Sequence, residues 1–100
     1  MIRHTALFTF RDGTGEAQID ALMAALLALK HDIPVIDRAA WGEIFSDRAN
    51  GHTHVVSFDF RDRAALEIFY GHPAHKQIVE TQIKPITASL LVLDYEEQNA

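Results

Sequence analysis

The spacing of apolar residues changes several times along this chain, and these changes constrain the fold more than any other feature. Residues 2–11 alternate in character, which is typical of a strand, and place Ile2, His4 and Phe8 on one face. From Ile19 to Lys30, apolar residues recur at three- and four-residue steps, which predicts an amphipathic helix. Thr14 is the residue that we expect to cap this helix.

The second half of the sequence predicts two strands that form a hairpin, then a helix and a last strand. We predict strands at residues 38–46 and 53–60. Residues 47–51 between them are typical of a turn, so the two strands should form a hairpin. A helix capped by Asp62 follows, is interrupted at residues 71–73, resumes through Ile83 and is closed by Pro85. Residues 86–95 predict a last strand.

The resulting order, β-α-β-β-α-β, predicts an α+β protomer with the split βαβ, or ferredoxin-like, arrangement. We expect the first and third strands to lie side by side and parallel in the sheet centre, with both helices on one face. The other face would be too apolar for water, so we predict a homodimer that packs sheet against sheet. Its expected residues are Thr5, Leu7, Val55, either Leu90 or Leu91, and either Trp41 or Ile44.

Composition limits the functions that this chain can have. A length of 100 residues with 48% apolar residues predicts one domain over residues 1–96, followed by a flexible tail at 97–100. The sequence has no cysteine and shows no signal peptide, which favours a cytoplasmic location. Its longest apolar run, residues 21–29, is too short to cross a bilayer. Nine scattered basic residues against 14 acidic ones argue against a nucleic-acid partner.

Histidines are the candidate functional residues. If the central strands are parallel, then His4 and His54 start them at the same end, and the later part of the second helix brings His75 there. Tyr95 would finish near His4, and Leu26 and Leu27 would supply apolar surroundings. Such a cluster could perform acid–base chemistry or, less readily, bind a divalent ion. The alternative is that each histidine is only a hydrogen-bonded core residue.

Several segments together resemble the stress-responsive dimeric α+β barrel (Dabb) family. They are residues 4–13, Trp41-Gly42, residues 53–56, the motif His72-Pro73-Ala74-His75, and residues 91–95. The resemblance implies a ferredoxin-like protomer, a homodimer and a pocket between sheet and helices. In some structures of the family, a metal ion lies in the loop that corresponds to residues 33–37 of this chain.

The family includes a plant polyketide cyclase, and its pattern implies roles for particular residues. His75 matches the catalytic base, which would act with His4 in an enzyme. The tyrosine that accompanies this base is replaced by Phe69, and we expect the adjacent Tyr70 to point to a different surface, because one helical residue turns the side chain by about 100°. The full expected pocket is His4, His54, Phe8, Leu22, Met23, Leu26, Leu27, Phe69, His72, His75 and Tyr95.

Two functional hypotheses follow from these observations. The first is a protein that binds a small hydrophobic or aromatic ligand without turnover, which the phenylalanine at position 69 favours. The second is a cyclase, isomerase or lyase that needs no cofactor and uses His75 and His4, which the convergence of histidines favours. We expect no metal and no cofactor under either hypothesis.

Overall fold

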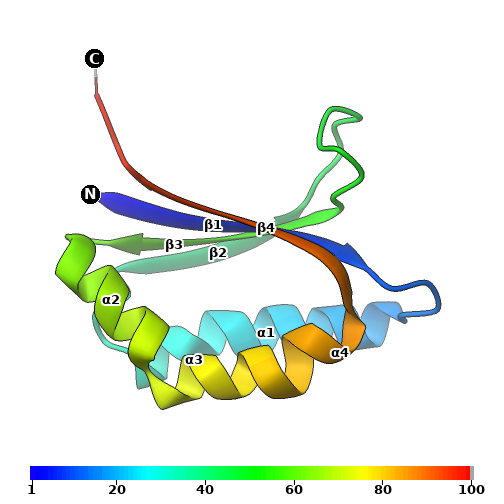
Figure 1. The fold of residues 1–100 in the computed structure, drawn as a ribbon, viewed down its shortest axis with the longest axis horizontal. Coiled ribbons are helices and arrows are strands. Elements are labelled where there is room, and N and C mark those ends of the chain that lie inside the picture. Colours follow the sequence, from blue (N-terminus) through cyan, green and yellow to red (C-terminus); the bar gives the residue numbers. More distant parts are fainter. Residues whose placement is uncertain (100) are drawn as a thin grey trace.

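Four strands form one antiparallel sheet in the order β2-β3-β1-β4, and the helices cover one of its faces (Figure 1). The structure is a computed structural model and describes residues 1–99. It has the predicted ferredoxin-like fold. The elements are β1 (Ile2–Phe10), α1 (Glu16–Asp32), β2 (Arg38–Glu43), β3 (His54–Phe60), α2 (Arg63–Gly71), α3 (Pro73–Ile78), the π-helical turn η1 (Val79–Ile83), α4 (Lys84–Ile86) and β4 (Thr87–Glu96).

The direction of β3 differs from the prediction. β1 and β3 are neighbours but run antiparallel, with Ile2 opposite Phe60 and Phe8 opposite His54. The reason lies in the connections: the crossover through α1 returns β2 parallel to β1, and the β2–β3 hairpin then reverses the chain. The starts of β1 and β3 therefore lie at opposite ends of the sheet.

Several element boundaries also differ from the prediction. Gly15, not Thr14, is the N-cap of α1, and the Thr14 hydroxyl instead donates to the Arg11 carbonyl at 2.7 Å. β2 ends at Glu43, three residues before the predicted end at position 46. Pro85 does not close the helix, because it occupies the first turn of α4, where a backbone N–H is not required.

The core lies between the sheet and the helices. Phe58 and Phe60 of β3 are fully buried there, together with Leu22 and Met23 of α1. Full burial of each such side chain stabilises the fold by about 1.5–3 kcal/mol. Leu22 and Met23, which we expected in a ligand pocket, are thus core residues that hold α1 against the sheet.

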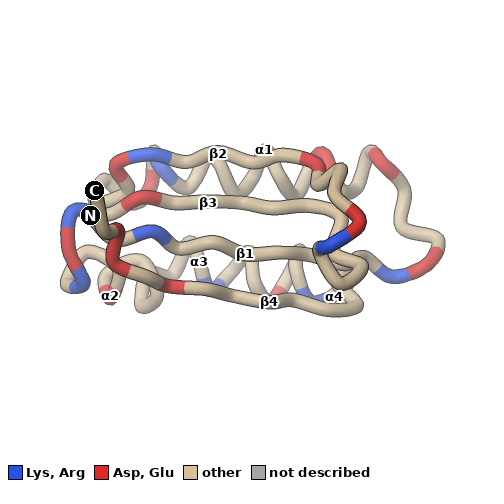
Figure 2. The backbone as a smooth tube through the Cα atoms, turned by 90° about the horizontal axis from the view of Figure 1, so that it is seen from above, with Lys and Arg blue, Asp and Glu red and all other residues tan. Residues whose placement is uncertain are grey.

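The face of the sheet opposite the helices, here called the outer face, is largely free of charge in its middle (Figure 2). Leu91 lies on it opposite Leu7, whereas Leu90 and Trp41 lie on the helix side. Charged residues gather at the ends of the strands, where Arg3 pairs with the buried Asp59 at 2.8 Å. On β4, an edge strand, Leu91 and Leu93 are 44% and 47% exposed, so this chain leaves an apolar surface open to water.

Candidate functional site

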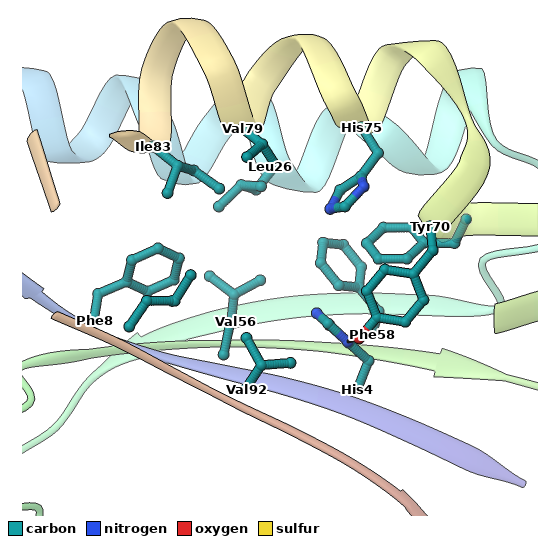
Figure 3. Close-up of a pocket in the computed structure, with 13 residues that line it drawn as sticks. His4, Phe8, Leu26, Val56, Phe58, Tyr70, His75, Val79, Ile83 and Val92 are labelled. Atoms are coloured by element: carbon teal, nitrogen blue, oxygen red, sulfur yellow. Dashed lines mark hydrogen bonds between the residues drawn. The ribbon is translucent and has the colours of Figure 1, made fainter. Parts of the chain in front are cut away.

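A cavity of about 210 Å³ lies between the sheet and the α3–η1 helix (Figure 3). Strands β1, β3 and β4 form its floor, while α1, α2 and the α3–η1 segment form its walls. Ten of its thirteen lining residues are apolar, and the three polar ones are His4, Tyr70 and His75. The apolar residues are Ala6, Phe8, Leu26, Val56, Phe58, Phe69, Val79, Ile83, Leu90 and Val92.

His4 is held in place by a carboxylate on the neighbouring strand. It lies opposite Asp94 in the β1–β4 register, is only 5% exposed, and its Nδ1 is 2.7 Å from Asp94 Oδ1. An ionised carboxylate only accepts hydrogen bonds, so Nδ1 of neutral His4 carries the proton and donates it. The other ring nitrogen, Nε2, then has a free lone pair, and it faces the cavity (Figure 3).

Tyr70 closes a three-residue network with His4 and Asp94. Its hydroxyl donates to Asp94 Oδ2 and lies 3.1 Å from His4 Nδ1. Each oxygen of the carboxylate therefore accepts from a different side chain. The prediction that Tyr70 points to a different surface is wrong. α2 lies at one end of the sheet (Figure 1), where Phe69 is buried and Tyr70 lines the cavity beside His4.

His75 projects from the first turn of α3 toward the sheet (Figure 3). Its ring centroid is 4.3 Å from that of Phe69, which is fully buried. Its Nδ1 atom is buried, and no hydrogen-bond partner for it is found among residues 1–99. An imidazole nitrogen in an apolar wall is costly to bury.

The electrostatics of the cavity keep both imidazoles neutral near pH 7. Burial lowers the pKa of His4 below its ordinary value, and the hydrogen bond and charge of Asp94 offset only part of this effect. Burial also lowers the pKa of His75, and the neighbouring His4 lowers it further. The pKa of Tyr70 is raised, first by burial and then by its hydrogen bond to Asp94, so its hydroxyl stays protonated.

The structure does not bring His54 to this site. Because β3 is antiparallel to β1, His54 pairs with Phe8 in register and lies far along the strand from His4. Its Nδ1 is 2.8 Å from Thr53 Oγ1, and its ring stacks on Trp41. The expected cluster of His4, His54 and His75 is thus a pair, His4 and His75.

The other predicted pocket residues divide into two groups. Phe8, Leu26 and Phe69 line the cavity. Leu22, Met23, Leu27, His72 and Tyr95 do not. The His72 ring caps α3 by accepting the Ala74 N–H at 3.1 Å. Tyr95 pairs with Arg3 in register, on the outer face, because it is one residue out of phase with Asp94.

Asp94 and Tyr70 are the polar site residues that the sequence interpretation missed. A signal for Asp94 is present: it follows the apolar run Leu90–Leu93 as a single carboxylate, and antiparallel pairing with β1 sets it opposite His4. In the part of the chain that the structure describes, no cluster of three or more His, Cys, Asp or Glu residues is arranged to hold a metal ion. No helix within positions 1–99 is long and apolar enough to span a membrane.

Two curated plant proteins are similar to this chain over almost its whole length. The stress-response A/B barrel domain-containing protein HS1 of Arabidopsis thaliana is 26% identical over 97 residues, covering 95% of this chain and 88% of HS1. Olivetolic acid cyclase of Cannabis sativa is 25% identical over 96 residues, covering 94% of each protein.

Solved structures share the same fold. Hydroxynitrile lyase from Passiflora edulis superposes with a TM-score of 0.91 at 23% identity, covering 99% of this chain and 94% of the lyase. A protein from Thermobifida fusca, described as a dimeric ferredoxin-like protein, has a TM-score of 0.79 and 26% identity over 94% of this chain and 88% of its own. Residues 2–97 match the stress responsive A/B barrel domain. The chain therefore belongs to the stress-responsive A/B barrel (Dabb) family.

Proposed function

We propose that this protein binds a small hydrophobic or aromatic ligand in the cavity between its sheet and helices. The observation that carries the proposal is the composition of the cavity wall: ten apolar residues surround it, and three polar side chains meet at one end. Ligand sites are mostly apolar, with a few polar groups that fix the orientation of the ligand. A volume of about 210 Å³ suits one aromatic ring or a short acyl chain.

The binding proposal is tested by filling the cavity. Val79 lines the cavity from η1 and is half-buried, so Val79→Trp would occupy the space that a ligand needs. Ile68→Trp is the matched control, because Ile68 is 53% exposed on α2 and does not line the cavity. We expect calorimetry to show saturable binding of a small aromatic ketone by the wild type and by Ile68→Trp, and none by Val79→Trp. Equal binding by all three proteins would contradict the proposal.

A second function, acid–base catalysis on the bound ligand, is favoured by one specific observation. Neutral His4 directs the Nε2 lone pair into the cavity, while Asp94 holds its Nδ1 proton at 2.7 Å. When Nε2 takes a proton from a ligand, the carboxylate stabilises the imidazolium that forms. His75 stands on the opposite wall as a second neutral imidazole that can exchange a proton with the same ligand. Similarity to olivetolic acid cyclase supports this function, whereas the lyase, at 23% identity, supports only the fold.

The catalytic proposal is tested with histidine variants against linear polyketide thioesters and small aromatic acids. His4→Ala and His75→Ala should each lower turnover by about 10²-fold or more, the usual size of a general acid–base contribution. His54→Ala is the control, because its ring lies outside the cavity. Ligand binding by the wild type with no turnover of any substrate would leave the protein as a binder. Turnover unaffected by either variant would exclude these histidines as the acid and base.

We also propose that two copies associate through the outer face. Leu7, Leu91 and Leu93 give this face an apolar middle, and its charged residues lie at the strand ends (Figure 2). The similar protein from Thermobifida fusca is described as dimeric. A stable interface should bury more than about 1,200 Å² in total. Sedimentation should show a dimer at micromolar concentration for the wild type and a monomer for Leu91→Arg; a wild-type monomer would contradict the proposal.

A further inference from the structure

An open groove adjoins the apolar end of the cavity. Ile83 and Leu90 line both the cavity and this groove, which has a volume of about 400 Å³. Figure 3 places Ile83 and Phe8 at the opposite end of the cavity from His4 and His75. A ligand too long for the inner cavity would therefore leave it past Ile83, with its other end beside the imidazoles.

The groove has cationic walls in a chain whose formal charge is −5. Arg11 and Lys84 line it together with Ser89, and none of its lining residues is acidic. Lys84 is paired with Glu80 at 2.6 Å, but Arg11 has no carboxylate within ion-pair distance among residues 1–99. One Arg11 nitrogen donates to the Lys84 carbonyl at 3.3 Å, at the start of α4, and the other N–H groups of the guanidinium stay available.

The inner end of the cavity is unsuited to an anion. His4 and His75 are neutral there, because burial lowers the pKa of each. The Asp94 carboxylate, hydrogen-bonded to His4, would repel a second negative charge at short range. An uncharged carbonyl or hydroxyl group meets none of this repulsion and can hydrogen-bond to an imidazole nitrogen.

These two ends differ in the charge that they accept, and we propose that the ligand is an amphiphile with one carboxylate: its uncharged end lies beside His4 and His75, and its carboxylate binds Arg11 in the groove. This inference rests on the proposed binding function and adds the class and orientation of the ligand. A guanidinium presents several donors in a fixed plane, which matches the two oxygens of a carboxylate.

The test compares phenylalkanoic acids of increasing chain length with their primary amides, which have the same shape without the charge. Calorimetry at low salt should show that the best acid binds the wild type about tenfold more tightly than its amide. Arg11→Gln should bring this ratio close to one and leave binding of the amide unchanged. Arg48→Gln is the control, because it removes the same charge from the exposed β2–β3 loop. Arg11→Lys should retain part of the preference.

Each outcome separates the carboxylate site from the cavity itself. Equal binding of acid and amide by the wild type, or a preference that persists in Arg11→Gln, overturns the carboxylate site and leaves the binding function standing. Binding of neither compound at any chain length overturns both proposals. A preference that Arg48→Gln removes as well would show long-range charge attraction instead of a site at Arg11.

Discussion

Replacing Asp94 with asparagine removes one acceptor from the network around His4. The carboxylate accepts from His4 at 2.7 Å and also from the Tyr70 hydroxyl, whereas an amide has one accepting oxygen and one donating nitrogen. His4 and Tyr70 donate to different oxygens of the carboxylate, so in Asp94→Asn one of them faces the amide nitrogen, and its hydrogen bond is lost or reversed. We therefore expect Asp94→Asn to change the proton position on His4 and to destabilise the fold.

The size of this effect follows from the burial of the two partners. A hydrogen bond to a charged group contributes about 1.5–3 kcal/mol to the free energy of unfolding. The His4 side chain is 6% exposed but that of Asp94 is 32% exposed, so we expect the lower end, about 1.5 kcal/mol. With an unfolding entropy of about 2.1 cal/mol/K per residue, a chain of 100 residues should lose about 7 °C in Tm.

Two measurements check this prediction. In the wild type, ¹⁵N NMR of the imidazole should show His4 protonated on Nδ1, and Asp94→Asn should reduce the fraction of this tautomer. Thermal unfolding at pH 8, where imidazole ionisation does not contribute, should show the loss in Tm. Asp47→Asn on the exposed hairpin loop is the control and should leave both unchanged. A wild-type His4 protonated on Nε2, or a loss below 2 °C in Asp94→Asn, would refute the reasoning.

Three further predictions follow from the burial of the cavity residues. Folding lowers the pKa values of His4 and His75, so the unfolded chain takes up protons first as the pH falls. The contribution of these two groups to stability is therefore present above pH 6.5 and is lost at lower pH. The urea midpoint should fall between about pH 7.5 and about pH 5, and a constant midpoint would contradict this. Phe69→Ala should lower the free energy of unfolding by about 3–5 kcal/mol in urea titrations, because this ring is 1% exposed; a loss below 1 kcal/mol would show that the core closes around the gap. Tyr70→Phe removes the hydroxyl that donates to Asp94 and should cost about 1 kcal/mol by the same titration, less than a buried hydrogen bond to a charged group because Tyr70 is 39% exposed; no loss at all would show that water replaces this hydrogen bond.

The sequence was sufficient to predict the order of the elements, because each carries a periodicity of its own. The spacing of apolar residues along β1 and along α1 shows which face of each element is buried. This information lies within each element and does not depend on the rest of the chain. The relative direction of β1 and β3 depends on two successive connections, the crossover through α1 and the β2–β3 hairpin. The prediction that they are parallel placed His54 beside His4. The hairpin before β3 reverses the chain and makes β3 antiparallel to β1.

The candidate site was predicted in part for the same reason. His4 and His75 both line the cavity. The alternation along β1 predicted the face of His4, and the return of the second helix along the sheet predicted that His75 lies at the same end. The orientation of Tyr70 depends on how α2 packs at the end of the sheet (Figure 1). The spacing of residues along the helix does not predict this packing. The π-helical turn at Val79–Ile83, which carries two cavity residues and lies just before Pro85, has no local sequence signal either.

The central claim is that a small ligand binds beside His4 and His75, and NMR titration with acetophenone tests it most directly. This probe is uncharged, carries one aromatic ring and offers a carbonyl oxygen to an imidazole. We expect the ring Hε1 signals of His4 and His75 to shift in a saturable way, with one shared dissociation constant, while His54 stays unchanged outside the cavity. Signals of His4 and His75 that do not move at saturating probe, or that move no more than that of His54, would contradict the claim.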